Sequence, residues 1–323
     1  MPLPGDGLRA VNVYVIEDDD GLVLIDSGWA LEGAREVMKS ALAAIGYRLE
    51  DVRRFLITHL HRDHYTCAVA LRREFGTRIQ LGSGEKPSLD RLAQIRRRPH
   101  AHHIARLRRC GAEELIGRLP GEPVDPSIWE QPDDWLEGGT EIALGSRTVA
   151  ALPTPGHTQG HLVFFDRRSG LLFAGDHVLP HITPSIGFEP EPGDAPLRDY
   201  LDSLALVRGL PDARLLPAHG WVTDSVHRRV DELLDHHAAR LDAVASAVTR
   251  GEGTRGEGTA YHTARLLTWT RRERAFTDLD PHNQMLAVLE TAAHLDVLVL
   301  RGRLRASEAD GVTRYEPRPP DPA

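Results

Sequence analysis

The sequence predicts an α/β fold class, with a mixed α/β catalytic region followed by a mainly helical one. Over the first two-thirds of the chain, short β-branched and apolar runs alternate with longer amphipathic patterns. After Trp221, helical patterns dominate for about 70 residues without a strong strand signal. The chain has 323 residues, of which 41% are hydrophobic and 27% charged, a globular composition. We therefore expect one domain over 1–222 and a helical domain over 223–323.

The first elements follow from local pattern. Two β-branched runs flank the turn-like sequence Asp18-Asp19-Asp20-Gly21, which predicts a hairpin. The predicted order is strand 11–16, strand 22–26, helix 30–45, strand 54–57, a helix from about 66 to 75, and strand 78–81.

The pattern changes between residues 84 and 137, where the chain is polar and rich in arginine and proline. We expect a helical insertion with loops in the first domain here. Regular signals then return as strands 141–152, 162–166 and 171–174, helix 196–208 and strand 213–216.

The last hundred residues contain a glycine-rich break and several helical patterns. The break is GEGTRGEG at 251–258. Helices are expected at 224–248, 260–268 and 281–295, and a small hairpin is expected around Asp310-Gly311.

Charge and cysteine content exclude several classes of protein. The 39 basic and 47 acidic residues give a formal charge of −8, which argues against a bulk nucleic-acid binder. Cys67 and Cys110 cannot form a disulfide scaffold. The first ten residues lack a signal-peptide pattern, and the apolar runs are shorter than the ~20 residues of a membrane span. We expect a cytoplasmic protein without a membrane partner.

The most informative stretch is Thr58-His59-Leu60-His61-Arg62-Asp63-His64, directly after a predicted strand. It places three imidazoles and a carboxylate within six positions. Such side chains are the ligands that zinc, iron and manganese take. The pattern predicts a metal site rather than a polar surface loop.

Three further ligand-type side chains stand at turns or strand ends beside small residues. They are His157 in Pro155-Gly156-His157, Asp176 in Ala174-Gly175-Asp176-His177, and His219 in Ala218-His219-Gly220. Small neighbours permit close backbone approach. Each motif is weak alone, but their order after the first motif strengthens the metal hypothesis.

These motifs resemble the metallo-β-lactamase superfamily, in its glyoxalase II-like dinuclear branch. The resemblance covers roughly residues 10–221 and rests on HLHRDH, TPGHTQGH, AGDH, AHG and the early LIDSG that contains Asp26. It implies a four-layer αββα sandwich with the metals at one edge, between two sheets. The C-terminal run from His236 to Arg240 and the RGRLRASEADGVTRYEP segment look like the winged-helix-like appendage of the β-lactamase-like protein 2 group.

The same resemblance implies the ligands of two divalent metal ions. His59, His61 and His157 would hold one ion, while Asp63, His64 and His219 would hold the other. Asp176 would bridge both. Zinc is the expected ion, and iron and manganese also suit these ligands.

A dinuclear site of this kind predicts hydrolysis of a small-molecule acyl substrate. A metal-bound hydroxide would attack the carbonyl of a thioester, ester or lactone. Asp63 and Asp176 are the expected catalytic carboxylates, Asp63 by orienting the nucleophile or accepting its proton. His177 and His181 are expected behind the ligands or at the rim, and Cys67 is expected to be a small buried residue.

Three alternatives remain open from the sequence. One is a ribonuclease or other phosphodiesterase, in which C-terminal arginines contact phosphates; these are Arg265, Arg271, Arg272 and Arg274. Another is a non-catalytic role, with the C-terminal helices as a dimer surface. The third is a sulfur dioxygenase with a single iron, which the complete second ligand set disfavours. The oligomeric state is left open.

Overall fold

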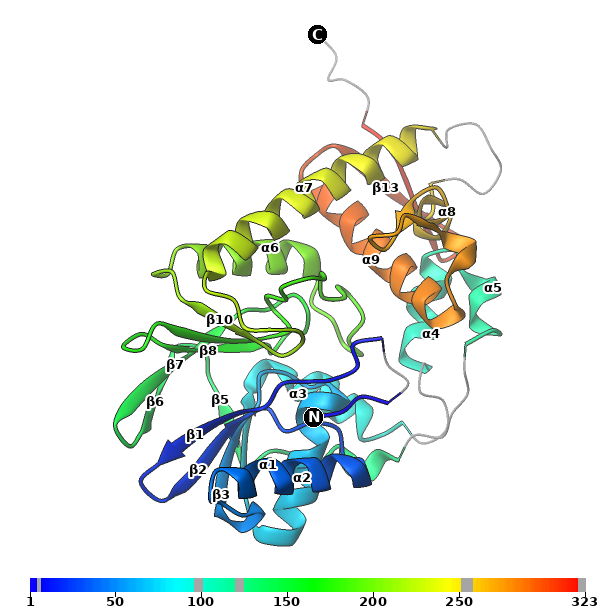
Figure 1. Ribbon diagram of the computed structural model, residues 1–323. Coiled ribbons are helices and arrows are strands. Elements are labelled where there is room, and N and C mark those ends of the chain that lie inside the picture. The colour runs from blue at the N-terminus through cyan, green and yellow to red at the C-terminus, as the bar shows by residue number, and fades with distance from the viewer. Residues whose placement is uncertain (5–6, 96–100, 120–124, 251–257, 319–323) are drawn as a thin grey trace. The chain divides into compact units, whose positions relative to one another are not determined.

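The computed structural model describes residues 1–4, 7–95, 101–119, 125–250 and 258–318 (Figure 1). The described residues divide into two compact units. The first comprises Met1–Gln94, Asp125–Pro184 and Asp199–Glu232, and the second comprises Ile95–Val124, Ser185–Arg198 and Leu233–Ala323. The predicted domain boundary at 222/223 stays a prediction. The predicted glycine-rich break lies outside the described residues, apart from Gly258.

Two five-stranded sheets form the centre of the first unit. The first sheet has the order β1 (Tyr14–Asp18), β2 (Gly21–Ile25), β3 (Val52–Leu56), β4 (Arg78–Gly82) and β5 (Asp134–Leu136). The second has the order β10 (Arg214–Pro217), β9 (Leu171–Gly175), β8 (Leu162–Asp166), β7 (Arg147–Pro153) and β6 (Thr140–Leu144). β2 to β5 run parallel, whereas β6 to β9 are joined as antiparallel neighbours.

The two sheets pack face to face and are covered by helices on their outer faces. Side chains from both sheets share one apolar core, for example Ile25 and Phe164. A second core joins the other face of the first sheet to α1 (Glu32–Ala44) and α2 (Arg62–Phe75). α6 (Pro196–Arg208) lies over the second sheet (Figure 1). The four-layer αββα sandwich is thereby confirmed.

Burial on both faces explains why the sequences of the central strands are continuous apolar runs. All five residues of β8, Leu-Val-Phe-Phe-Asp, are buried, because helices or the other sheet cover both of its faces. Its final Asp166 accepts a hydrogen bond from the backbone of Ser169 in the following turn.

Two strand predictions in the first unit were wrong. The expected strand 141–152 is a hairpin, in which β6 turns back into β7 through Gly145 at φ +45°. β5 within the predicted insertion was missed, since three residues are too short to show a period. It pairs with β4 and forms an edge of the first sheet.

The insertion also carries the predicted helices. They are α3 (Lys86–Leu92), α4 (Ala101–Arg109) and α5 (Glu113–Ile116). Short 3-10 turns lie in the first unit at Leu49–Asp51, Ser83–Glu85 and Pro126–Ile128. The insertion is divided between the two units, because α4 and α5 belong to the second.

Helices dominate the C-terminal region, as predicted. α7 (Val226–Arg250) crosses the boundary of the units, and α8 (Ala260–Arg265) and α9 (Pro281–Leu300) lie in the second unit. The predicted hairpin is β13 (Leu304–Ala309) and β14 (Val312–Pro317), with Asp310 and Gly311 at positive φ between them. The small ribbon of β11 (Thr268–Trp269) and β12 (Arg274–Ala275) and the 3-10 turn Phe276–Asp278 were not predicted. Among the described helices, none has the length and apolar character needed to cross a bilayer.

Candidate metal centre

The HLHRDH motif begins in the loop after β3 and continues into α2. The helix starts at Arg62, four residues earlier than the sequence predicted, so that Asp63 and His64 lie in its first turn. A carboxylate there is stabilised by the exposed N–H groups of the helix N-terminus. Ser27 fixes this start, because its hydroxyl donates to the His64 carbonyl at 2.6 Å and accepts from the Ala68 amide at 3.0 Å.

The seven predicted ligands form two groups that could each hold a metal ion. The first consists of His59, His61, His157 and Asp176, and the second consists of Asp63, His64 and His219. Within each group the candidate ligand atoms lie within 4.8 Å of one another. The loops after β3, β7, β9 and β10 supply five of them, and the first turn of α2 supplies Asp63 and His64, so segments that follow strands of both sheets contribute to the centre.

The first group is closely packed around one imidazole nitrogen. His61 Nδ1 lies 3.0 Å from His59 Nε2 and 3.1 Å from His157 Nε2. These three nitrogens point toward a common centre. Neutral imidazoles in this arrangement can donate their lone pairs to one cation.

Asp176 stands between the two groups. Its Oδ2 lies 3.6 Å from His157 Nε2 in the first group. Its Oδ1 lies 3.3 Å from His219 Nε2 and 3.8 Å from His64 Nε2 in the second. A carboxylate that faces one histidine set with each oxygen is suited to bridge two cations.

Three candidate ligand atoms are buried and have no hydrogen-bond partner among the described residues. They are His64 Nε2, His219 Nε2 and Asp176 Oδ1. An unsatisfied buried polar atom is costly and needs an explanation. Both nitrogens lie within 3.8 Å of the carboxylate oxygen, which suits a bound cation, so the residues present fit a metal ion.

The opposite nitrogens of these histidines are held by acceptors. His219 Nδ1 donates to the Ala10 carbonyl at 2.8 Å, and His64 Nδ1 donates to Asp26 Oδ2 at 2.9 Å. Because these acceptors have no proton to give, Nδ1 of each ring carries one. In the neutral ring, Nε2 then presents its lone pair to the centre.

Asp26 organises the back of the site. Its carboxylate accepts from the Thr58 amide at 2.8 Å and from the Thr58 hydroxyl at 2.9 Å. That hydroxyl also lies 3.0 Å from His59 Nδ1, so Asp26 supports histidines of both groups. Its φ of +60° is unusual for a residue other than glycine and marks local backbone strain at a functional position.

His59 and His61 of the first group are held neutral. Burial lowers the pKa of both His59 and His61 well below the usual value, and the neighbouring imidazoles act in the same direction for each. The neutral ring is the form that binds a metal.

The second group concentrates negative charge. Burial lowers the pKa of His64, but the carboxylates of Asp63, Asp26 and Asp176 outweigh burial and raise it to about 10. Three carboxylates therefore favour positive charge at this position, whether it is a proton or a metal ion.

His161 is a site residue that the sequence analysis did not assign. Its ring stacks on His59 with 5.0 Å between centroids, and its Nδ1 lies 2.9 Å from Thr154 Oγ1. Its Nε2 accepts the Asp176 amide at 3.3 Å, so it orients the bridging residue from behind. In the sequence, its place as the second histidine of TPGHTQGH could have indicated this role.

Glu85 is a second unassigned residue, and it lies far from the motifs in sequence. Its fully buried carboxyl group accepts from the Thr158 hydroxyl at 2.5 Å and from the backbone of Leu60. Leu60 lies between His59 and His61, and Thr158 follows His157. Glu85 thus joins the two loops that carry the histidines of the first group.

The sequence analysis also named His177, His181 and Cys67, which are not among the candidate ligands. His177 is buried against Tyr200, with 5.2 Å between ring centroids. The His181 ring contacts Trp221 at 3.7 Å between centroids. Cys67 is buried, as expected, and burial raises the pKa of its thiol to about 11, which keeps it unreactive at neutral pH.

Comparisons with known proteins agree with this geometry. A solved β-lactamase domain protein from Burkholderia ambifaria superposes with a TM-score of 0.77 at 28% identity, covering 98% of this chain and 90% of that one. Among curated proteins, the chain is 26% identical over 234 residues to the "Beta-lactamase-like protein 2 homolog" of Caenorhabditis elegans, covering 72% of this chain and 63% of the relative.

A third relative carries a more specific name. The chain is 24% identical over 257 residues to the "Atrochrysone carboxyl ACP thioesterase" of Aspergillus fumigatus, covering 78% of this chain and 48% of the relative. The chain also spans only 44% and 61% of the length of two fungal lactamase-like proteins that it matches.

The family model described as "Metallo-beta-lactamase superfamily" matches residues 6–219. That span contains both sheets and all seven candidate ligands. The chain therefore belongs to the metallo-β-lactamase superfamily.

Proposed function

We propose that the chain is a dinuclear metal-dependent hydrolase of thioesters, esters or lactones. The observation that supports this most directly is the placement of Asp176, whose Oδ2 lies 3.6 Å from His157 Nε2 and whose Oδ1 lies 3.3 Å from His219 Nε2. We assign His59, His61 and His157 to one ion, Asp63, His64 and His219 to the other, and Asp176 to both.

Two divalent cations in this centre would make a water molecule acidic enough to act as a nucleophile at neutral pH and would polarise a substrate oxygen. Asp63 is the chain's own candidate for handling the proton. Burial raises the pKa of its carboxyl group, but His64, His219 and His61 outweigh burial and lower it overall. The carboxylate is therefore ionised at neutral pH, and it can orient a nucleophilic water and accept its proton.

An acyl substrate is favoured by the name of one relative, and a water nucleophile is favoured by the burial of Cys67. One curated relative is named as a thioesterase, and the chain matches it over 78% of its own length. Cys67, the cysteine nearest the ligands in sequence, is buried and protonated, so it cannot act as the nucleophile in place of water. We also propose zinc as the metal and the cytoplasm as the location.

The test is a substrate panel with the metal-loaded protein. Short- and long-chain acyl thioesters, lactones and a single-stranded RNA are assayed with wild type and with Asp176→Asn. We expect wild type to hydrolyse an acyl substrate and Asp176→Asn to lose at least about 100-fold in rate, because one amide cannot replace a bridging carboxylate. Hydrolysis by Asp176→Asn at the wild-type rate would overturn the assignment.

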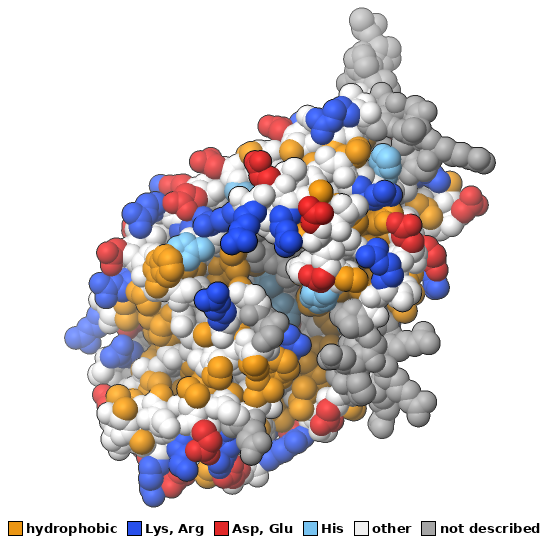
Figure 2. All heavy atoms as spheres, turned by 45° about the vertical axis from the view of Figure 1, so that its right-hand side comes forward, with side chains coloured by type: hydrophobic (Ala, Val, Ile, Leu, Met, Phe, Trp, Pro, Cys, Tyr) orange, Lys and Arg blue, Asp and Glu red, His pale blue; other side chains and the backbone are white. Residues whose placement is uncertain are grey.

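RNA cleavage without acyl hydrolysis would replace the proposal with the phosphodiesterase alternative. The charge distribution does not favour that outcome. Acidic and basic side chains are interspersed over the face drawn in Figure 2, and the whole chain carries a formal charge of −8.

A further inference from the structure

The peptide bond between Gly175 and Asp176 is held from both sides. Its carbonyl, on Gly175, accepts a hydrogen bond from the Ala218 amide at 3.0 Å. Its N–H, on Asp176, donates to His161 Nε2 at 3.3 Å. Because a peptide group is planar, hydrogen bonds on both of its polar atoms fix its orientation. They therefore also restrict the direction in which the Asp176 side chain leaves the backbone.

The two partners of this peptide lie beside different ligand groups. Ala218 directly precedes His219 of the second group. His161 stacks on His59 of the first group, with 5.0 Å between the ring centroids and 25° between the ring planes. The backbone of the candidate bridging residue is thus linked to the surroundings of both groups that its carboxylate faces.

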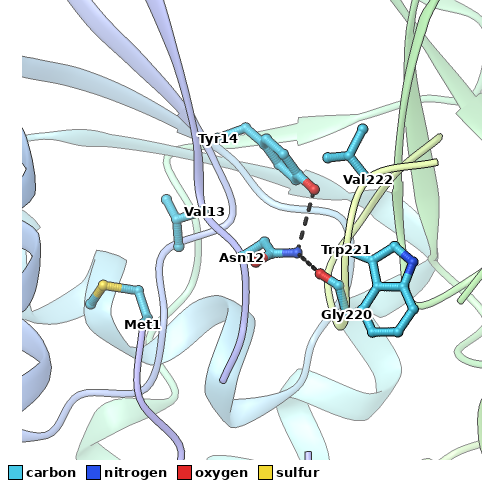
Figure 3. Close-up of a pocket in the computed structure, with 7 residues that line it drawn as sticks. All are labelled: Met1, Asn12, Val13, Tyr14, Gly220, Trp221 and Val222. Carbon is cyan, nitrogen blue, oxygen red and sulfur yellow. Dashed lines mark hydrogen bonds between the residues drawn. The ribbon is translucent and has the colours of Figure 1, made fainter. Parts of the chain in front are cut away.

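The Ala218 side of this arrangement is fixed by Asn12. The Asn12 backbone amide donates to the Ala218 carbonyl at 2.7 Å. The Asn12 side chain donates to the carbonyls of Pro217 at 2.9 Å and Gly220 at 2.8 Å, and Figure 3 shows the second of these bonds. The segment is therefore held on both sides of His219.

The His161 side depends on which imidazole nitrogen carries the proton. Because His161 Nε2 faces the N–H of Asp176, it has to accept and cannot carry a proton. The proton of the ring then lies on Nδ1, which is 2.9 Å from Thr154 Oγ1. The Thr154 amide also donates to the His161 carbonyl at 2.9 Å. Thr154 therefore favours the tautomer of His161 that can hold Asp176.

Glycine at position 175 allows the His161 ring to approach the backbone this closely. Gly175 has a φ of +51°, and an added Cβ would lie 2.8 Å from His161 Nε2 and 2.7 Å from Thr58 Cβ. A side chain at this position would displace the ring or Thr58. The AGDH motif thus leaves room for an imidazole against the peptide that precedes Asp176.

We propose that His161 is a positioning residue, which holds Asp176 in the orientation in which its carboxylate reaches both metal ions. His161 lies outside both ligand groups, and its Nε2 is used by the Asp176 amide. The inference rests on the proposed dinuclear function and deepens it, because the bridge then depends on a residue that binds neither ion. Loss of the Nε2 acceptor should disturb the bridge while the histidine ligands remain.

The test uses the cobalt-loaded protein, since cobalt can replace zinc and its electron spin reports on a neighbouring ion. Wild type with two equivalents is expected to give the EPR spectrum of a spin-coupled pair. His161→Leu removes the acceptor, so we expect loss of the coupling and about 10–100-fold weaker binding of one equivalent. His161→Gln can place its side-chain oxygen near the position of Nε2, and it is expected to keep the coupling.

Thr154→Val is a second test that leaves the His161 side chain in place. It removes the acceptor of Nδ1–H, so the tautomer with a proton on Nε2, which opposes the Asp176 amide, is no longer disfavoured. We expect weaker coupling than in wild type. His237→Leu is the control, because it replaces another buried histidine, in the second unit. It should keep the coupled spectrum.

Two results would overturn the role given to His161. One is a wild-type spectrum in both His161→Leu and Thr154→Val. The other is equal loss of coupling in His161→Leu and His237→Leu, which would indicate a general structural defect. Loss in His161→Leu with retention in His161→Gln and His237→Leu would support the proposal.

Hydrolysis, measured on the same proteins, separates this inference from the proposed function. The expected series of spectra without hydrolysis of any acyl substrate would retain the role of His161 and reject the hydrolase. Hydrolysis by wild type, with the coupled spectrum in every variant, would retain the hydrolase and reject the role of His161. A single cobalt equivalent in wild type would reject the bridge and this inference with it.

Discussion

At the residue scale, the chemistry of the centre depends on groups that do not themselves face the metal position. Asp26 fixes the proton on His64 Nδ1 and, through Thr58, supports His59. Such indirect partners orient metal ligands and raise their basicity. Asp26 is buried at the end of β2. The surrounding hydrogen bonds hold its backbone in a strained conformation.

Asp26→Asn should therefore weaken metal binding without removing a ligand. An amide keeps the shape but cannot accept as strongly from both His64 and Thr58. We expect the affinity for zinc to fall about 10–100-fold, measured by competition with a chromophoric chelator. Asp166→Asn is the control, because Asp166 is equally buried but belongs to the turn after β8. Equal affinities in the two variants would contradict the role given to Asp26.

Residues of this kind show how far the sequence could predict the site. The seven candidate ligands were predicted because each stands in a short motif at a turn or strand end, and the structure brings them together. Glu85 was not predicted, since its partners Leu60 and Thr158 lie 25 and 73 positions away. No local pattern encodes a contact of that range.

At the element scale, the ligand loops are held by close backbone contacts. A Cβ added at Gly160 would overlap the backbone of Glu85 and Gly84, so the loop after β7 fits only without a side chain there. This contact places the loop of His157 against the turn that carries Glu85. The elements themselves were largely predictable from periodicity, but the early start of α2 was not, because its first turn consists of polar ligand residues.

Gly160→Ala tests this close packing. We expect it to lower the free energy of unfolding by about 1–3 kcal/mol in urea denaturation, since backbone atoms must move to admit the methyl group. Gly33→Ala in α1 is the control, because its added Cβ meets nothing within 4 Å. That variant should be unchanged or more stable by up to about 1 kcal/mol. Equal stabilities for the two variants would show that the contact is not tight.

Glu85→Ala should affect one ligand group more than the other. Its loss frees the loops of His59 and His157 from each other, whereas His64 and His219 are held by Asp26 and Ala10. In a stepwise zinc titration, we expect one equivalent to bind about 10–100-fold more weakly and the other to bind nearly as in wild type. Equal weakening of both equivalents would argue for a general structural defect.

At the scale of the whole molecule, the αββα sandwich and the helical C-terminal region followed from the sequence, but the composition of the second unit did not. Arg106 of α4 donates to the carbonyls of Gly187 and Glu189 within that unit. These segments lie more than 80 positions apart. Periodicity predicts elements, not which distant elements share a core.

The second unit also contains a buried histidine pair that predicts acid sensitivity. His237 Nδ1 lies 3.3 Å from His294 Nε2. Burial lowers the pKa of His237 to about 2 and of His294 to about 4. The unfolded chain therefore binds more protons below about pH 6.5, and the free energy of unfolding should fall as the pH drops from 6.5 to about 4.

The double variant His237→Leu/His294→Leu tests this account. Each histidine contributes up to about 1.4 kcal/mol per pH unit in that window. We expect urea denaturation of the metal-free variant to show a shallower dependence on pH than metal-free wild type. Parallel curves would mean that the pair does not remain neutral in the folded chain.

The central claim is that the chain holds two metal ions bridged by Asp176. The most direct measurement is elemental analysis of the zinc-reconstituted protein after removal of free metal, for wild type and Asp176→Ala. We predict about two equivalents per chain for wild type and less than one for the variant. A single equivalent in wild type, or two retained equivalents in Asp176→Ala, would contradict the account.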